Sequence, residues 1–490
     1  MSRGVSLSGG GVGKSGLRVA FLTSEAVPFA KTGGLGDVSG ALPKALVGLG
    51  VDACIVHPLY ATTDRRHLRE QLFDNLEVEW LGERRRAAVW LSEAAGAPAF
   101  LIDAPEYFGR GKVYGFGDDH LRFAFFSRAA LALFGRLGFA PDVLHGNDWP
   151  SGFAAAWLWA GRMWGGYFAR ARTLLSIHNL AYQGLFDPGD LYRLGFRHGE
   201  ESNIFLSNGA ASSLKAGLMV CDGISTVSRR YSHEIQTPEH GHGLDWLLRQ
   251  RQERLIGITN GVDYDIWNPA TDPHLAAHYS VEDVSGKRAC KLDLLRRFRL
   301  PEELDRPVVA TISRLVAQKG FDLLKQAAGQ ILESGAFFVA LGSGEAEYEN
   351  FLQWMHDVAP RRVAVYRGFH EPLAHQIEAG ADIFLMPSIF EPCGLNQMYS
   401  MRYGTVPVVR ATGGLDDTVE PWDPARGSGT GFKFGPYTPH AMMEKLREAL
   451  FWYGRPEAWR RMQQNGMRAD NSWEAAARKY VKVYEALTNL

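Results

Sequence analysis

The segment Leu17-Arg18-Val19-Ala20-Phe21-Leu22-Thr23 leads, a few residues later, into the turn Lys31-Thr32-Gly33-Gly34-Leu35-Gly36-Asp37. The first stretch is a short apolar run, which is typical of a strand buried on both faces. The glycines mark a turn, and we expect a helix to follow from Val38 to Leu49. A strand that enters a helix through a glycine-rich turn is the building unit of a parallel α/β sheet.

The same alternation continues along the chain. Further strands are expected at residues 53–58, 99–103, 143–146, 174–178 and 223–227, with helices at 121–137 and 153–163. The pattern restarts after the turn signal at 260–263. Strands are then expected at 308–312, 337–341, 363–366, 383–387 and 406–409, with helices at 323–332 and 346–358. The sequence therefore predicts an α/β fold of two Rossmann-like, doubly wound domains with parallel sheets.

This pattern also suggests where the domains begin and end. We expect a flexible leader at 1–16, an N-terminal domain at 17–265, a C-terminal domain at 266–470 and a last helix at 471–490. The last helix has a serine start and amphipathic spacing, and we expect it to pack back on the N-terminal domain. Ligands of such sheets bind beyond the carboxyl ends of the strands. We therefore expect the loops of the two domains to face a cleft between them.

The leader contains a segment, Gly9-Gly10-Gly11-Val12-Gly13-Lys14-Ser15, that is similar to a phosphate-binding P-loop. Ser8 stands where that motif requires its first glycine, and the segment precedes the first strand rather than following one. We interpret it as flexible chain. The alternative, a nucleotide hydrolase that uses this segment, predicts that deletion of residues 1–16 abolishes activity.

The composition narrows the class of protein. A length of 490 residues, with 46% hydrophobic and 22% charged residues, fits a globular enzyme of two or three domains. The formal net charge of −1 argues against nucleic acid or an anionic membrane as a partner. No apolar run of about 18 residues suggests a membrane span. The four cysteines are widely spaced, which favours a reducing compartment, and we expect a cytoplasmic protein.

A pair of cations follows one of the predicted strands. Arg314 and Lys319 lie five residues apart, directly after the strand at 308–312. Paired cations can offset the charge of a diphosphate as it becomes a leaving group, with arginine binding it bidentately. The alternative is a solvated helix start, in which both side chains simply face water.

Glu391 follows the strand at 383–387 and could bind a sugar hydroxyl or stabilise an oxocarbenium-like centre. It could equally be an acidic residue in the first turn of a helix. The diglycines Gly33-Gly34 and Gly413-Gly414 could present backbone amides to phosphate oxygens, although diglycines are also common in ordinary turns.

Polar side chains also gather after two strands of the first half. His178 and Asn179 end one predicted strand, where they could approach a reacting sugar, although a single histidine is often structural. His145, Asp148 and Trp149 form a further group, in which the aromatic ring could stack on a sugar. These histidines and the aspartate lack the compact spacing of a metal-binding motif, and we predict no metal site.

Taken together, these segments resemble the glycogen and bacterial starch synthases, which are retaining α-glucan glycosyltransferases of the two-domain GT-B fold. The similarity extends in order from about residue 17 to the C-terminus. The segments that carry it are Lys31-Thr32-Gly33-Gly34-Leu35, Ser176-Ile177-His178-Asn179-Leu180-Ala181-Tyr182-Gln183-Gly184, Thr259-Asn260-Gly261-Val262-Asp263, Ser313-Arg314-Leu315, Gln318-Lys319-Gly320, Phe390-Glu391-Pro392-Cys393-Gly394-Leu395 and Thr412-Gly413-Gly414-Leu415.

The resemblance implies glucose transfer from a nucleotide sugar, ADP-glucose in most bacteria, to the non-reducing 4-hydroxyl of an α-1,4-glucan, without a metal or cofactor. The implied catalytic residues are Glu391, Arg314, Lys319, His178 and Asp37. The implied donor-binding residues are Lys31, Gly33, Gly34, Asn260, Cys393, Gly394, Leu395, Thr412, Gly413 and Gly414. The implied acceptor-binding residues are Glu25, Tyr114, Asp148, Trp149 and Asn179.

The chain departs from the resembled pattern at two positions. Tyr399 stands where the wider GT-B group often has a second glutamate, and Asn147 stands in a motif that usually reads His-x-His-Asp-Trp. Asn147 can form hydrogen bonds but cannot titrate, which puts the details of acceptor binding in question.

Three alternatives stay open from the sequence. The donor could be UDP-glucose, and the chain could be an inactive glucan-binding protein. It could also be a pyridoxal-phosphate-dependent phosphorylase, although no Schiff-base lysine can be identified in the sequence.

Overall fold

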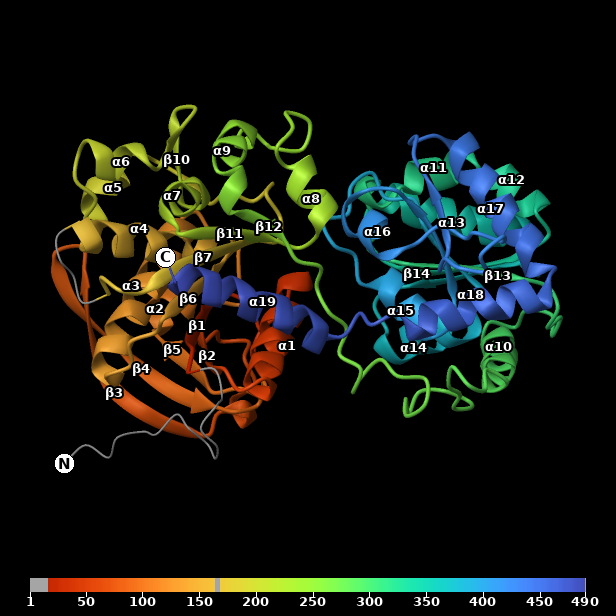
Figure 1. The fold of residues 1–490 in the computed structure, drawn as a ribbon, viewed down its shortest axis with the longest axis horizontal. Helices are drawn as coiled ribbons and strands as arrows, with labels where there is room; N and C mark the ends of the chain where they lie inside the picture. Colours follow the sequence, from red (N-terminus) through yellow and green to blue (C-terminus); the bar gives the residue numbers. More distant parts are fainter. Residues whose placement is uncertain (1–15, 164–167, 490) are drawn as a thin grey trace. The chain divides into compact units, whose positions relative to one another are not determined.

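The computed structural model of the chain describes residues 16–163 and 168–489 (Figure 1). The chain forms two compact units. Unit 1 extends to Gly261 and resumes at Trp473, and unit 2 comprises Val262–Ser472. The P-loop-like segment at 9–15 lies outside the described residues, as does nearly all of the predicted leader.

Unit 1 is built on a mainly parallel sheet. Its strands are β1 (Arg18–Leu22), β2 (Asp52–Pro58), β3 (Glu70–Trp80), β4 (Glu83–Ser92), β5 (Ala99–Asp103), β6 (Val143–Asn147), β7 (Arg172–Ile177), β11 (Gly223–Thr226) and β12 (Leu255–Gly257). Within the described residues they form a nine-stranded sheet in the order β12-β11-β7-β6-β1-β2-β5-β4-β3. Pairs from β12 to β5 are parallel, while β4 pairs antiparallel with both β5 and β3. A small antiparallel sheet holds β8 (Leu185–Phe186), β9 (Leu206–Ser207) and β10 (Ala210–Ser212).

Helices cover both faces of this sheet. They are α1 (Gly34–Gly48), α2 (Pro105–Phe108), α3 (Asp119–Leu137), α4 (Asp148–Met163), α5 (Asp190–Arg193), α6 (Glu200–Asn203), α7 (Ser213–Val220), α8 (Arg229–Glu234), α9 (Asp245–Gln250) and α19 (Trp473–Thr488), with 3-10 turns at Arg65–His67 and Gln252–Arg254. Successive side chains of a strand point to opposite faces. Ala20 and Leu22 of β1 therefore enter the core with α3, while Val19 and Phe21 enter a second core with α1 and α19.

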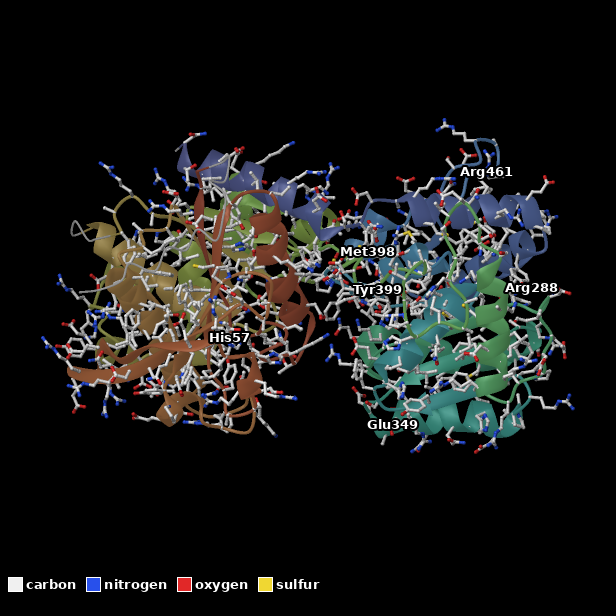
Figure 2. The ribbon with its side chains drawn as sticks, turned by 90° about the horizontal axis from the view of Figure 1, so that it is seen from below. His57, Arg288, Glu349, Met398, Tyr399 and Arg461 are labelled. Carbon is white, nitrogen blue, oxygen red and sulfur yellow. The ribbon has the colours of Figure 1, made fainter. Side chains whose placement is uncertain are left out.

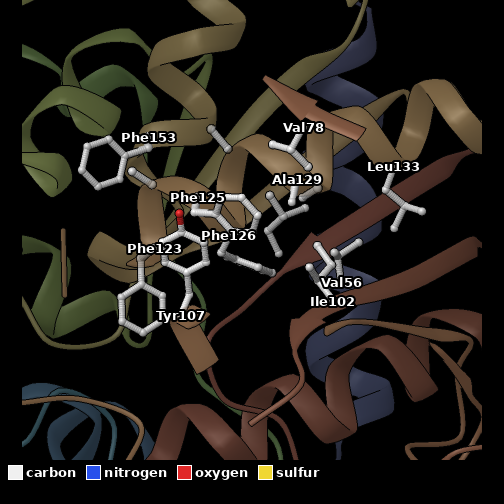
Figure 3. Close-up of a cluster of buried hydrophobic side chains, with 14 of the residues drawn as sticks. Val56, Val78, Ile102, Tyr107, Phe123, Phe125, Phe126, Ala129, Leu133 and Phe153 are labelled. Carbon is white, nitrogen blue, oxygen red and sulfur yellow. The ribbon is translucent and has the colours of Figure 1, made fainter. Parts of the chain in front are cut away.

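The larger core of unit 1 is rich in aromatic side chains. Figure 3 shows Tyr107, Phe123, Phe125 and Phe153 among them, and the rings of Tyr107 and Phe125 stack at 4.2 Å between centroids. Such rings bury large apolar areas, and their contacts fix the orientation of α3 beneath the sheet. This core therefore anchors the strand ends that carry the polar clusters of unit 1.

The C-terminal helix α19 completes unit 1 rather than unit 2. Its Tyr480, Tyr484 and Leu487 are buried in the same cluster as Leu42 and Leu46 of α1. The Tyr484 hydroxyl also lies 2.8 Å from Nδ1 of His145, in the middle of β6. The last residues of the chain are thus part of the core that holds β1 and β6 in place.

Unit 2 is built on a fully parallel sheet. Its strands are β13 (Val308–Ile312), β14 (Phe337–Gly342), β15 (Val363–Arg367), β16 (Ile383–Met386), β17 (Val406–Arg410) and β18 (Phe432–Phe434). In the described chain their order is β15-β14-β13-β16-β17-β18. The helices are α10 (Gly286–Arg297), α11 (Phe321–Gln326), α12 (Ala328–Glu333), α13 (Ala346–Val358), α14 (Glu371–Gly380), α15 (Asn396–Arg402), α16 (Gly413–Thr418), α17 (Pro439–Tyr453) and α18 (Pro456–Arg468), with a 3-10 turn at Ala317–Lys319.

The predicted fold class, two α/β domains with parallel sheets, is confirmed. Two details of the prediction were wrong. The helix expected at 323–332 is divided into α11 and α12 at Ala327, whose φ of −94° and ψ of 3° leave the helical range. The antiparallel hairpin of β3 and β4 was not predicted, because its strands alternate apolar and charged residues instead of forming a continuous apolar run.

Candidate active site

In each unit, the predicted polar clusters lie where the strand order of the sheet reverses. In unit 2, Arg314 follows β13, Glu391 follows β16 and Gly413 follows β17, and these three strands are neighbours. Parallel strands all end at the same edge of a sheet, and the crevice at the reversal point is where ligands of doubly wound sheets bind. The structure therefore brings together residues that are far apart in the sequence.

A cavity of about 190 Å³ opens at this edge of unit 2. Its lining residues are Thr311, Ile312, Ser313, Arg314, Lys319, Leu385, Met386, Ser388, Glu391, Gly394, Leu395 and Asn396. Five of them were predicted as site residues: Arg314, Lys319, Glu391, Gly394 and Leu395. Ser388 and Asn396 were missed. Their position just after β16 was the available signal, but serine and asparagine are common in loops.

A carboxylate and an ammonium group meet inside this cavity. Nζ of Lys319 lies 2.6 Å from Oε2 of Glu391, and the two side chains are only 18% and 8% exposed. The Ser388 hydroxyl donates to the same carboxylate oxygen at 3.1 Å. A pair this well shielded from water is held more rigidly than a surface ion pair. In contrast, Arg314 is exposed, and its guanidinium has no ion-pair partner among residues 16–163 and 168–489.

Backbone contacts fix the two loops that supply this pair. The Ile389 N–H donates to the Gln318 carbonyl at 2.8 Å, and the Gln318 side-chain amide donates to the Phe390 carbonyl at 3.1 Å. The loop after β13 and the loop after β16 therefore form one hydrogen-bonded assembly. This explains why Lys319 and Glu391 meet although each follows a different strand.

The diglycine after β17 packs directly beneath Glu391. A Cβ atom on Gly413 would lie 1.9 Å from the Glu391 carbonyl oxygen, and one on Gly414 would lie 2.0 Å from that of Cys393. The Gly414 N–H donates to the carbonyls of Glu391 and Pro392, at 3.1 and 3.2 Å. That amide is engaged within the protein, which corrects the expectation that it is available to a phosphate. Thr412 and Cys393, also predicted to bind the donor, are buried beside this turn.

Unit 1 has its own reversal point, between β1 and β6. Glu25 follows β1, and its carboxylate accepts hydrogen bonds from the Thr32 and Gly33 amides, at 2.5 and 3.0 Å, and from the Tyr114 hydroxyl at 2.9 Å. The Gly33 amide is thus bound to Glu25, which corrects the expectation that it faces a diphosphate. Glu25 and Tyr114, predicted as acceptor contacts, also hold the glycine-rich loop in shape. Gly34, the first residue of α1, is exposed.

The same loop carries a second cation and carboxylate. Nζ of Lys31 lies 2.7 Å from Oδ1 of Asp37, and both side chains are partly exposed, at 50% and 31%. Because water screens such a pair, it contributes little stability by itself. Lys31 can therefore turn from Asp37 toward an incoming anion at low energetic cost.

His178 and Asn179 lie at the end of β7, next to the start of α4. Oδ1 of Asp148 accepts the His178 N–H at 2.7 Å and the Asn179 N–H at 3.4 Å. Asp148 itself has a positive φ of 52°, a strained conformation for a residue with a side chain and one that concentrates at functional sites. Trp149 follows it, and its ring lies 6.1 Å from that of Tyr114. Together with the hydrogen bond between Glu25 and Tyr114, these contacts mean that each of the five predicted acceptor residues lies against another of the five.

His145 serves the fold rather than the site. Its ring is fully buried and hydrogen-bonds to Tyr484 through Nδ1 and to Ser176 through Nε2, at 2.8 and 2.6 Å. Both ring nitrogens are therefore used within the protein. No group of three or more potential ligands that could hold a metal ion occurs in the described part of the chain.

Asn260 and Tyr399 do not belong to the lining of the cavity of unit 2. Asn260 is buried, and its Oδ1 has no hydrogen-bond partner among the described residues, so an acceptor is left there for a further donor. Tyr399, labelled in Figure 2, does not line the cavity of unit 2. Its ring stacks on Trp267 at 3.8 Å, and Trp267 stacks in turn on His375 at 3.8 Å. Tyr399 therefore packs the segment that enters unit 2, and takes no part in the cavity.

Burial raises the pKa of the Asp148 carboxyl to about 7, although the hydrogen bonds from His178 and Asn179 oppose this shift. Since the folded pKa is above the ordinary value of about 4, this group's contribution to stability is fully present at low pH and is lost as pH rises to about 7. We expect Asp148→Asn to remove that loss, because the amide stays neutral and its oxygen can still accept both N–H groups. Relative to the wild type, the variant should gain roughly 2 kcal/mol in free energy of unfolding between about pH 5 and about pH 8.

Urea unfolding at both pH values measures this difference. The exposed Asp74 provides the control, since Asp74→Asn should change the stability equally at the two pH values. An Asp148→Asn effect that does not change with pH would contradict the assignment.

The two units match different family models. The model described as "Starch synthase catalytic domain" matches residues 18–250, and "Glycosyl transferases group 1" matches residues 295–467. A glycogen synthase of Anaeromyxobacter sp. (strain Fw109-5) is 46% identical over 482 residues, which cover 96% of this chain and 99% of the relative. A glycogen synthase of Geobacillus thermodenitrificans (strain NG80-2) is 42% identical over 96% of this chain and 98% of its own.

The chain belongs to the glycogen and starch synthase family. It is therefore a glycosyltransferase, and its two α/β units have the GT-B fold. Among solved structures, the catalytic domain of starch synthase IV from Arabidopsis thaliana, bound to ADP and acarbose, is 34% identical with a TM-score of 0.88. It covers 97% of this chain and 100% of its own. Among the residues that the structure places, no helix combines the length and apolar character needed to cross a membrane.

Proposed function

We propose that this enzyme transfers glucose from ADP-glucose to the non-reducing 4-hydroxyl of an α-1,4-glucan, with retention of the anomeric configuration. The observation that carries the proposal is the cavity of unit 2, which is lined by the Lys319–Glu391 pair and by the unpaired, exposed Arg314. Two cations and one carboxylate suit a sugar diphosphate, since the cations balance the phosphates and the carboxylate accepts from sugar hydroxyls. The ADP bound to the plant starch synthase supports an adenine nucleotide as the leaving group.

The predicted residues whose side chains or backbone remain available to substrates then have the following roles. Arg314 and Lys319 bind the diphosphate and stabilise the charge that develops on it as the glycosidic bond breaks. Glu391 binds the donor glucose, with Gly394 and Leu395 beside it. From unit 1, His178 and Asp37 act at the reacting sugar, while Asp148, Trp149 and Asn179 bind the glucan. Lys31 adds a further cation for the diphosphate.

For the chemical step we propose attack of the acceptor hydroxyl on the same face of the sugar that the diphosphate leaves. The leaving phosphate oxygen takes the acceptor proton, so the new glycosidic bond forms as the bond to phosphate breaks. No enzyme nucleophile is required, which agrees with the use of Glu25 in loop hydrogen bonds. Neither a metal nor a cofactor takes part. All four cysteines are buried thiols that form no disulfide, which suits a reducing compartment such as the cytoplasm.

Incorporation of labelled glucose into glycogen tests the proposal, with ADP-glucose and UDP-glucose compared in parallel in the presence of EDTA. We expect strong incorporation from ADP-glucose, in a product that an exo-hydrolase specific for α-1,4 linkages releases completely. A preference for UDP-glucose would overturn the donor assignment and keep the chemistry. Glycogen binding without incorporation from either donor would favour an inactive glucan-binding protein.

A further inference from the structure

We infer that Asn147 is a positioning residue that holds the imidazole of His178 in the tautomer protonated at Nε2. Asn147 is the last residue of β6 and is fully buried. Its Nδ2 donates to the Leu22 carbonyl at 3.0 Å. Because a carbonyl can only accept, this bond fixes the NH₂ group on the Leu22 side and turns Oδ1 of Asn147 toward His178.

The orientation of Asn147 decides where the proton lies on the histidine. Oδ1 of Asn147 is 2.9 Å from Nε2 of His178. An amide oxygen only accepts, so Nε2 must carry a proton, and in the neutral ring Nδ1 is then unprotonated. His178 is partly exposed, and within the described chain its Nδ1 has no hydrogen-bond partner. The ring therefore offers an acceptor to a hydroxyl group of a bound sugar. This role rests on the proposed function, which places His178 at the reacting sugar.

No other neighbour can replace Asn147 in this role. The titratable groups that interact with His178 are His145 on β6 and Asp148 at the start of α4. Further out, Glu25 after β1 acts on Asp148, and Tyr231 on α8 accepts the Leu180 N–H. In the part of the chain that the structure describes, none of them hydrogen-bonds a ring nitrogen of His178. Burial lowers the pKa of His178 to about 4, so the ring is neutral near pH 7 and the tautomer matters.

A role in fixing the His178 tautomer also explains how asparagine can stand at position 147, where the resembled motif has histidine. A histidine at that position, as in the resembled motif, would offer one donor and one acceptor on its ring. The asparagine amide offers the same pair, but it cannot take up a proton. The asparagine therefore preserves the hydrogen bonds to Leu22 and His178, and these bonds do not depend on the protonation of residue 147.

The first test uses Asn147→Leu, which is similar in size and removes the acceptor. NMR of histidine labelled with ¹⁵N reports the tautomer directly, with the His178 signals identified by their loss in His178→Ala. We expect wild-type His178 to be protonated at Nε2 and the variant to lose that preference. The kcat should fall about tenfold or more, while the KM for the nucleotide sugar changes little. A wild-type ring protonated at Nδ1, or an unchanged kcat in Asn147→Leu, would overturn the inference.

The second test uses Asn147→Asp, which places a carboxylate against Nε2. The added negative charge favours one more proton on the pair formed by the new carboxylate and the His178 ring. Between pH 6 and pH 9, the variant should therefore be least active near pH 6 and recover as that proton is lost toward pH 9. The control is Asn75→Asp, an exposed site on β3 with the same change of charge. A pH profile equal to that of the control would contradict the positioning role.

The proposed function and the positioning role of Asn147 can fail separately. If the wild-type enzyme transfers no glucose, the proposed function fails, but the NMR measurement still decides the tautomer. If Asn147→Leu does not fold, the wild-type tautomer and the Asn147→Asp profile still decide the inference.

Discussion

Replacing Lys319 with alanine should lower kcat by a factor of about 10² to 10³, which corresponds to roughly 3 to 4 kcal/mol of transition-state stabilisation. Lys319 lines the cavity of unit 2 and lies 2.6 Å from the Glu391 carboxylate. Under the proposed function, its loss removes a positive charge from beside the leaving diphosphate. It also leaves Glu391, which is 8% exposed, with the Ser388 hydroxyl as its remaining side-chain partner among the described residues. Steady-state kinetics with saturating glycogen measure the effect.

The matched control is Lys325→Ala. Lys325 lies on α11 of the same unit and pairs with Glu347, but it is half exposed and outside the cavity. We expect its kcat to equal that of the wild type, since exposed ion pairs contribute little. A kcat near wild type in Lys319→Ala, with normal thermal stability, would contradict the role of Lys319 at the diphosphate.

The second large effect is expected from Gly413→Ala. The φ of Gly413 is 44°, and an added Cβ would lie 1.9 Å from the Glu391 carbonyl oxygen. The turn after β17 and the loop after β16 would have to separate, which would displace the Glu391 carboxylate and break the hydrogen bonds from Gly414. We expect a loss of about 3 kcal/mol or more in stability and loss of transferase activity, because strain and packing act on the same backbone.

Gly329→Ala provides the control for this substitution. Gly329 lies in α12, no atom lies within 4 Å of its added Cβ, and alanine favours a helix more than glycine does. This variant should be as stable as the wild type or more so. Wild-type stability and activity in Gly413→Ala would show that neither depends on the close approach of the loops after β16 and β17.

The sequence was sufficient for the buried parallel strands because burial on both faces requires an unbroken apolar run. β13 was predicted with the boundaries that the structure has, from Val308 to Ile312. The hairpin of β3 and β4 was not predicted, because its two strands mix charged and apolar residues. Its two-residue turn, Leu81-Gly82, has positive φ at both positions, and this turn was the local signal that could have revealed it.

The candidate site was only partly predictable, for a different reason. The positions of Arg314, Lys319 and Glu391 follow from strand ends, which the sequence locates. The partners of Gly33 and Gly414 depend on where distant loops lie, so their amides were expected to face phosphate and instead bond to Glu25 and Glu391. Asn147 was noticed only as a departure from a motif, since its role requires the distances to both Leu22 and His178.

The placement of α19 in unit 1 has a consequence for biosynthesis. The ribosome synthesises all of unit 2 before it makes the helix that covers Leu42 and Leu46 and that supplies Tyr484 to His145. Until α19 is made, the nascent first unit therefore exposes the apolar face of α1 that this helix covers. A chain that ends prematurely near residue 472 would retain the whole cavity of unit 2 and still be a substrate for chaperones and proteases. We therefore expect the core of unit 1 to be completed only after α19 has left the ribosome.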